Sequence, residues 1–185
     1  KGTKVGLFLP NSPTFIVYFF AVLKAGGTIV NYNPLYTVSE LSVQVKDSDT
    51  EIMVTLDLKV LFDKVDALLQ SGVLSRAIVC SFAPLLPPVK ATLFRLFKSK
   101  DLARPHTSPA RERIVLDAAL LEGPDQPKPV KIDPRTDVAV LNCTVGTPSL
   151  PQGALPRTGT SFRNLPQSGA PSTPHPAKCR ELRWA

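Results

Sequence analysis

The sequence predicts an α/β fold in which a partial doubly wound, mostly parallel sheet is flanked by helices. Three observations predict this fold. Four short apolar segments alternate with three helical segments over residues 1–82. The apolar segments are continuous rather than alternating, which is typical of strands buried on both faces. The connections are long enough for right-handed crossovers, which place helices against the faces of a parallel sheet.

The first strand and helix begin at the amino terminus. Residues 4–9 form an apolar run of strand length. Ser12 is placed to cap a helix that starts at Pro13, where the missing N–H costs nothing. Apolar residues then recur at helical spacing until the Gly26–Gly27 pair ends the helix. Residues 28–31 are predicted to be the second strand.

The next two helices are predicted from their caps. Residues 37–40 form a capping box, in which the Thr hydroxyl and the Glu carboxylate each satisfy a backbone amide. Residues 51–56 are the predicted third strand. Asp57 is placed to cap the third helix, which carries apolar residues on one face and ends at Gly72. Residues 76–82 are the predicted fourth strand.

The region from residue 83 to residue 135 is richer in proline. Residues 89–100 are predicted to form a short basic amphipathic helix after a cluster of prolines. The stretch 101–135 is predicted to be a long surface loop, interrupted by a short helix around residues 114–121. Residues 137–142 are the next predicted strand.

Charge and proline divide the chain of 185 residues into two parts. Residues 1–141 carry a net charge of +3, while residues 142–185 carry the remaining +4 of the total +7 and 7 of the 19 prolines. We therefore expect 1–141 to be the N-terminal segment of a larger domain and 142–185 to include an irregular tail. The cationic residues of the tail are scattered, so we expect no nucleic-acid partner. Because the chain opens without Met directly into a strand, we also expect a fragment.

The spacing of reactive side chains indicates no catalytic residue and no metal site. Cys80, Cys143 and Cys179 show neither a CxxC spacing nor a nearby His. His106 and His175 lie beside prolines with no visible partner, and we interpret them as surface residues. The longest apolar run is about half as long as a membrane span. The first residues show no leader pattern, so we expect none to be part of this chain. We expect a cytoplasmic location.

A Thr- and Gly-containing loop follows the strand predicted at 137–142. Residues 144–154 read TVGTPSLPQGA. Glycines let backbone amides approach phosphate oxygens, and hydroxyl groups complete the contacts. The candidate phosphate-binding residues are Thr144, Gly146, Thr147 and Gly153.

Four segments of the sequence carry a resemblance to a known family. They are residues 5–13 (VGLFLPNSP), 23–27 (LKAGG), 31–41 (NYNPLYTVSEL) and 132–141 (IDPRTDVAVL). These segments resemble the adenylate-forming acyl-CoA synthetases, above all the bacterial long-chain fatty-acid–CoA ligases. The resemblance covers residues 1–142 and implies the N-terminal part of that family's large domain.

The resemblance implies a reaction, its cofactors and its substrates. A ligase of this kind activates a long-chain fatty acid with ATP and Mg²⁺ through an acyl-adenylate, and the thiol of coenzyme A then displaces AMP. The family's phosphate loop usually reads Thr-(Ser/Gly)-Gly-Thr-Thr-Gly-x-Pro-Lys-Gly. Here Pro148 replaces a Thr, Ser149 a Gly and Gln152 the Lys. An amide donor, a permissive backbone and a positive charge are lost. We therefore expect this chain to bind these cofactors poorly and to be inactive.

The basic helix supports an alternative function. An interfacial helix would place apolar side chains in lipid and cations at anionic headgroups. The candidate membrane-surface residues are Lys90, Leu93, Arg95, Phe97 and Lys98. We favour a surface helix packed on the sheet domain, since such helices are common. The alternative is a non-catalytic α/β module, or a decayed remnant, that associates with a partner or peripherally with the inner face of the membrane. Oligomeric state and acyl chain length stay open.

Overall fold

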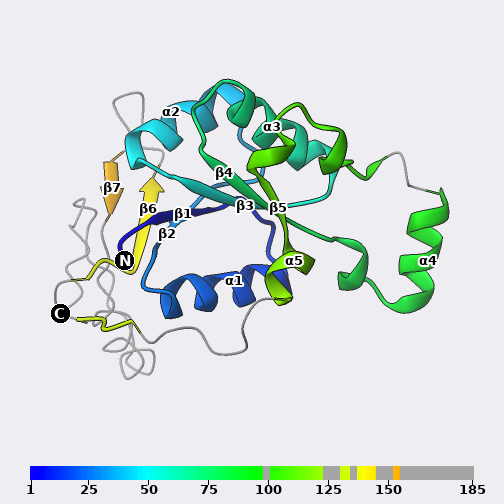
Figure 1. Ribbon diagram of the computed structural model, residues 1–185, viewed down its shortest axis with the longest axis horizontal. Helices are drawn as coiled ribbons and strands as arrows, with labels where there is room; N and C mark the ends of the chain where they lie inside the picture. The colour runs from blue at the N-terminus through cyan, green and yellow to red at the C-terminus, as the bar shows by residue number, and fades with distance from the viewer. Residues whose placement is uncertain (98–100, 123–129, 134–136, 145–151, 155–185) are drawn as a thin grey trace, which may run out of the picture.

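The computed structural model describes residues 1–97, 101–122, 130–133, 137–144 and 152–154 (Figure 1). The strands are β1 (Lys4–Leu7), β2 (Thr28–Asn31), β3 (Ile52–Leu56), β4 (Arg76–Cys80), β5 (Ile114–Leu116), β6 (Val140–Thr144) and β7 (Gln152–Ala154). The helices are α1 (Pro13–Lys24), α2 (Val38–Ser48), α3 (Lys59–Gln70), α4 (Pro88–Phe97) and α5 (Asp117–Leu121), with short 3₁₀ turns at Ala83–Leu85, Pro105–Thr107 and Arg111–Arg113.

The strands form one sheet in the order β5-β4-β3-β1-β2-β6-β7. The first six are parallel, and β7 pairs antiparallel with β6. Helices α1 and α5 lie on one face of the sheet, and α2 and α3 lie on the other (Figure 1). The predicted α/β class with a mostly parallel sheet is confirmed.

The predicted start of α1 is also confirmed. The side chain of Ser12 accepts a hydrogen bond from the N–H of Phe15, and Pro13 occupies the first helical position. Gly26, just beyond the helix, has a φ of +74°, in the left-handed region that favours glycine. A Cβ there would also lie 2.7 Å from a methyl carbon of Val130.

The centre of the sheet holds a small network of buried hydroxyl groups. The hydroxyl of Tyr32, directly after β2, lies 2.7 Å from that of Ser48 and 2.6 Å from that of Thr50. Ser48 also donates to the carbonyl of Gln44 within α2. Gly6 in β1 leaves room for the Tyr32 ring, because a Cβ there would lie 2.7 Å from Cε2 of that ring. The network thus joins the end of α2 to the residue after β2 and to the segment before β3.

The capping box of α2 is confirmed. The hydroxyl of Thr37 accepts from the N–H of Glu40, and the Glu40 carboxylate accepts from the N–H and the hydroxyl of Thr37, each at 2.8 Å. Both donors favour the ionised carboxylate, so they hold the pKa of Glu40 below its ordinary value of 4.5.

This depressed pKa predicts a pH dependence of stability. The stabilisation from the Glu40 carboxylate is present above its unfolded pKa and is lost as the pH falls through the folded pKa. We expect Glu40→Gln to lose less stability than the wild type between about pH 7 and about pH 3. Urea unfolding followed by far-UV circular dichroism measures the difference. Glu112→Gln is the matched control, and a Glu40→Gln profile parallel to the wild type contradicts the prediction.

The predicted cap of α3 is wrong. The N-cap residue is Leu58, and no side chain caps the helix. Asp57 instead accepts a hydrogen bond from the N–H of Phe82 at 2.7 Å, and its own carbonyl accepts from Ala103. Because β3 and β4 are parallel neighbours, the residue after β3 lies beside the residues after β4. The Asp57 carboxylate therefore bonds to a backbone N–H beyond the neighbouring strand β4, and not to the first turn of α3 as the local sequence pattern predicts.

The helix predicted around residues 114–121 is wrong in its first half. Ile114–Leu116 forms β5, which pairs with β4, and only Asp117–Leu121 is helical. Two β-branched residues at its start favour the strand. Other boundaries differ by a few residues: β1 ends at Leu7, β4 ends at Cys80, and β6 begins at Val140. None of the helices in the described ranges combines the length and apolar character needed to cross a membrane.

Candidate functional site

The carboxyl ends of the parallel strands meet at one edge of the sheet, which is where open α/β sheets bind ligands. Strands β2 and β6 are neighbours there, with Asn31 opposite Asn142. The turn after β2 therefore lies next to the point where the chain leaves β6. The predicted phosphate loop begins at that point.

The structure describes two of the four candidate phosphate-binding residues. Thr144 is the last residue of β6, and Gly153 lies in β7. Gln152, at the position of the family's Lys, pairs with Thr144. The two ends of the predicted loop thus lie side by side. Gly146 and Thr147 lie outside the described residues.

The turn after β2 is closed by its own first residue. The side-chain oxygen of Asn33 accepts from the N–H of Leu35 at 3.0 Å, and its carbonyl accepts from the N–H of Tyr36 at 3.0 Å. These bonds explain why Asn begins the NPLYT segment, since Asn side chains close turns of this kind. The NPLYT segment, which is part of the resemblance to the synthetases, therefore forms a hydrogen-bonded turn at the carboxyl edge of the sheet.

A lysine from α3 holds this turn in place. The ammonium of Lys64 donates to the carbonyls of Pro34 at 3.2 Å and Tyr36 at 2.7 Å. It also lies 5.8 Å from the centre of the Phe8 ring, directly after β1, within the range of a cation–π contact. The sequence carried no signal for this role, because the bonds go to backbone carbonyls about thirty residues away.

The last residue of β4, Cys80, carries a buried thiol. Burial raises the pKa of Cys80 to about 12, while a hydrogen bond with Tyr18 acts in the opposite direction. Burial also raises the pKa of Tyr18 above its ordinary value. A neutral, buried thiol is a poor nucleophile and a poor metal ligand. Cys80 is therefore suited to packing in the core, and His106 is exposed as predicted.

Metal-ligating side chains are not gathered into a site in the part of the chain that the structure describes. No cluster of three or more His, Cys, Asp or Glu side chains is arranged to hold an ion there. The acidic groups at the carboxyl edge are used by backbone donors. Asp117 accepts from the N–H groups of Ala118 and Ser81, and Asp57 accepts from Phe82.

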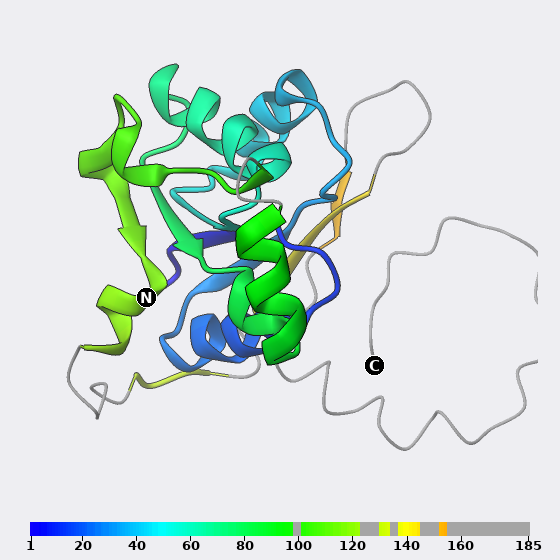
Figure 2. The ribbon, with the colours of Figure 1, turned by 90° about the vertical axis from the view of Figure 1, so that its right-hand side faces the viewer.

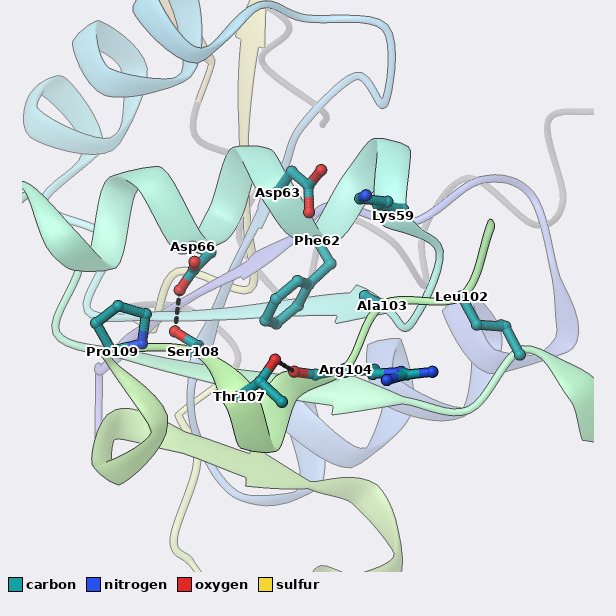
Figure 3. Close-up of a pocket in the computed structure, with 10 residues that line it drawn as sticks. All are labelled: Lys59, Phe62, Asp63, Asp66, Leu102, Ala103, Arg104, Thr107, Ser108 and Pro109. Atoms are coloured by element: carbon teal, nitrogen blue, oxygen red, sulfur yellow. Dashed lines mark hydrogen bonds between the residues drawn. The ribbon is translucent and has the colours of Figure 1, made fainter. Parts of the chain in front are cut away.

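A hollow of about 540 Å³ lies between α3 and residues 102–109 (Figure 3). The ring of Phe62 points from α3 into the space between them. The Asp66 carboxylate accepts from the hydroxyl of Ser108 and from the side chain of Gln70, which ties the segment to the helix. The rim carries charges of both signs, from Lys59 to Asp63. This hollow borders α3 and contains none of the candidate phosphate-binding residues.

The candidate membrane helix α4 lies beyond the end of the sheet, at the right of Figure 1 and in front in Figure 2. Lys90 is exposed, and Leu93 is 56% exposed. The ring of Phe94 packs edge-on against Phe82, with 5.3 Å between their centres. Arg95 and Phe97 lie on the helix, but their side chains and the whole of Lys98 are outside the described part.

Comparison with known proteins gives one family. A profile of the family described as "AMP-binding enzyme" matches residues 1–172. The long-chain-fatty-acid–CoA ligase of Bacillus subtilis strain 168 is 32% identical over 155 residues, which are 84% of this chain and 27% of that protein. The enzyme of the same name from Escherichia coli O157:H7 is 31% identical over 185 residues, and the match covers 96% of this chain and 32% of that protein. The chain thus spans less than a third of the length of these relatives.

Solved structures show a similar fold. The crystal structure of a long-chain-fatty-acid-CoA ligase from Archaeoglobus fulgidus superposes with a TM-score of 0.63 at 22% identity. The match covers 91% of this chain and 27% of that one. The sheet described above is therefore the architecture found in part of that protein.

Proposed function

The chain belongs to the AMP-binding enzyme family, and on that premise we propose that it forms the N-terminal part of a long-chain fatty-acid–CoA ligase. The observation that carries the proposal is the identity of about 30% to ligases of that name over most of this chain. The substrates would be a long-chain fatty acid, ATP and coenzyme A. The fatty-acid carboxylate attacks the α-phosphate of ATP and releases pyrophosphate, and the thiol of coenzyme A then displaces AMP.

The role proposed for this chain is to hold the phosphates of ATP. Thr144, Gly146, Thr147 and Gly153 would supply hydroxyl and backbone donors, and electrostatic stabilisation of this kind carries much of phosphate chemistry. The adjacency of β2 and β6 supports the proposal, because it puts the turn held by Lys64 beside the start of the loop. We assign no residue of this chain to Mg²⁺, since the described residues include no cluster of three or more His, Cys, Asp or Glu side chains.

We propose further that the 185-residue chain makes no acyl-CoA by itself. Pro148, Ser149 and Gln152 weaken the phosphate loop, and the chain covers only 27–32% of its relatives. The test incubates the purified chain with palmitate, ATP and coenzyme A and measures palmitoyl-CoA by chromatography. The intact Bacillus subtilis ligase is the positive control. Product that depends on both ATP and coenzyme A would overturn the proposed inactivity.

A second candidate function is association with a lipid surface through α4. The supporting observation is an exposed leucine, Leu93, on a helix that also exposes Lys90 and contacts the 3₁₀ turn after β4 through Phe94 and Phe82. Such a helix could bury its apolar side chains at the acyl boundary while cations meet anionic headgroups. A peripheral location at the membrane follows from this candidate.

Replacing Leu93 by Asp tests the lipid candidate. Burial of a leucine is worth about 2 kcal/mol, so we expect binding to phosphatidylglycerol vesicles to fall about tenfold or more. Co-sedimentation of the chain with vesicles measures the binding. The matched control is Val60→Asp, since Val60 is 67% exposed on α3. Equal loss in both variants, or wild-type binding too weak to detect, contradicts the lipid candidate.

A further inference from the structure

The side chain of Lys64 lies half-buried between α3 and the turn after β2. A lysine on the outside of a helix usually keeps its ammonium in water, because a compact charge is strongly hydrated. Here two carbonyls of one turn accept hydrogen bonds from the ammonium, at 3.2 Å and 2.7 Å. Hydrogen bonds from a charged donor belong to the stronger class. Lys64 is therefore a fixed contact of the fold and not a freely moving surface charge.

Two further groups surround the ammonium of Lys64. The ring of Phe8, which is fully buried directly after β1, has its centre 5.8 Å from the nitrogen. The carboxylate of Glu40 lies in the first turn of α2. Hydrogen bonds from Thr37 lower the pKa of Glu40 most, and the positive charge of Lys64 lowers it further. Lys64 thus contacts the ends of β1 and β2 and acts on the start of α2.

The turn that Lys64 contacts is closed by local bonds. Asn33 accepts from the N–H groups of Leu35 and Tyr36, and Leu35 at the tip is 85% exposed. Bonds between residues two or three apart fix the shape of a turn but not its place relative to the rest of the sheet. The bonds from Lys64 come from another element, about thirty residues away. They therefore fix the place of the turn.

This turn lies beside the end of β6. Strands β2 and β6 pair in parallel, with Asn31 opposite Asn142. Two residues farther along each chain are Asn33, which begins the turn, and Thr144, which ends β6. Thr144 is also the first of the candidate phosphate-binding residues. The turn is therefore the neighbour of the candidate phosphate loop on the β2 side.

We propose that Lys64 is a positioning residue for ATP. Its ammonium holds the turn at residues 33–36 beside the end of β6, and this contact sets the place from which the phosphate loop starts, at Thr144. Lys64 acts through the turn and not on the nucleotide, since its ammonium is bonded to the two carbonyls. The inference rests on the proposed function, because it takes the residues after β6 to hold the phosphates of ATP.

Positioning and a purely structural role predict different results when Lys64 is replaced. A structural loss lowers the fraction of folded protein, which affects the use of every substrate equally. A displaced turn affects the phosphates of ATP and spares the other substrates. Lys64→Met keeps the length of the stem and removes the charge and the donors, whereas Lys64→Arg keeps both. Lys46→Met is the matched control, because Lys46 is exposed in the last turn of α2.

The first experiment measures the coupling between the turn and β6 in the 185-residue chain. Hydrogen exchange is followed by mass spectrometry on peptides that cover residues 33–36 and 140–144. We expect Lys64→Met to exchange about fivefold faster in both peptides, the factor that corresponds to one lost hydrogen bond. Lys64→Arg and Lys46→Met should exchange as the wild type does. If Lys64→Met does not fold by circular dichroism, Lys64→Gln takes its place.

The second experiment measures ATP itself. The chain carrying Pro148→Thr, Ser149→Gly and Gln152→Lys is fused to the part of the Bacillus subtilis ligase that lies beyond the matched region. Calorimetry gives the Kd of ATP, and palmitoyl-CoA formation gives KM for each substrate. We expect Lys64→Met to raise Kd and KM for ATP about tenfold, since a small displacement of binding groups has effects of this size. Values of KM for coenzyme A and palmitate should stay within about twofold, as should all values for Lys46→Met.

Several results would overturn the positioning role. One is unchanged exchange at residues 140–144 in Lys64→Met. Another is a KM that rises equally for ATP and coenzyme A, or for coenzyme A alone. A third is an effect of Lys64→Met that disappears in a Glu40→Gln background, because Lys64 would then act on the cap of α2.

Failure of the proposed function gives a different pattern. A fusion whose ATP affinity depends on Lys64 but that makes no palmitoyl-CoA supports the positioning role and rejects the ligase function. A fusion that makes palmitoyl-CoA with the same ATP affinity in Lys64→Met rejects the positioning role alone. A folded fusion that binds no ATP overturns both.

Discussion

Replacing Gly6 by Ala is expected to lower the free energy of unfolding by about 3 kcal/mol, because the new methyl group has no space. Its Cβ would lie 2.7 Å from Cε2 of Tyr32 and 3.1 Å from a methyl carbon of Thr50. The Tyr32 ring cannot swing aside freely, since its hydroxyl is bonded to Ser48 and Thr50 in the buried network. Urea unfolding followed by far-UV circular dichroism measures the loss.

Two further variants separate this clash from the general cost of replacing a glycine. Gly72→Ala meets no atom within 4 Å but has a φ of +73°, so we expect a loss of about 1 kcal/mol. Tyr32→Leu removes the obstructing ring edge, and in that background Gly6→Ala should cost less than about 1 kcal/mol. A Gly6→Ala cost equal to that of Gly72→Ala, or unchanged by Tyr32→Leu, would show that the ring does not set the requirement for glycine.

Restoring the phosphate loop is expected to increase acyl-CoA formation about a hundredfold, the effect of one or two well-placed donors. The variant is Pro148→Thr, Ser149→Gly and Gln152→Lys, in the chain fused to the remainder of the Bacillus subtilis ligase. It returns an amide donor, a permissive backbone and a cation toward the phosphates. Palmitoyl-CoA formed with ATP and coenzyme A is measured by chromatography.

The control for the restored charge replaces Gln152 by Met in place of Lys, with the other two changes kept. We expect it to recover a smaller part of the activity, because methionine has no positive charge to place near phosphate. A triple variant no more active than the unmodified fusion, in a protein shown to be folded, would mean that these departures are not what limits the chain. High activity of the unmodified fusion would contradict the expected weakness of the loop.

The order of strands and helices followed from the sequence because apolar runs and caps are local signals. Ser12 and the capping box at Thr37 and Glu40 act on amides within three residues, and both were predicted. Asp57 was assigned wrongly because its partner, Phe82, comes from the next strand. Strand β5 was missed because three residues at the edge of a sheet have too little length to show a period.

In the candidate site, too, the features encoded by consecutive residues could be predicted, and the contacts between distant residues could not. The candidate phosphate loop could be proposed from the sequence because its residues follow one strand in order. The structure describes its two ends, Thr144 and Gly153, and phosphate binding by the loop stays a prediction. Lys64 could not be found, since any helix has lysines on its outer side and only the folded chain brings this one to Pro34 and Tyr36. The apolar spacing predicted helix α1, but the exposure of Ile16, Val17 and Phe20 could be seen only in the structure.

The hydroxyl network around Tyr32 has a consequence for how the molecule opens. Tyr32 follows β2, Ser48 ends α2, and Thr50 precedes β3, while the Tyr32 ring leans on Gly6 in β1. Separating β2 from β3 would leave buried hydroxyl groups without partners, which costs about 1–3 kcal/mol for each group, and β1 lies between these two strands. The three central strands therefore form a single cooperative unit toward partial unfolding, while edge strand β5 and helix α4 can detach at lower free energy.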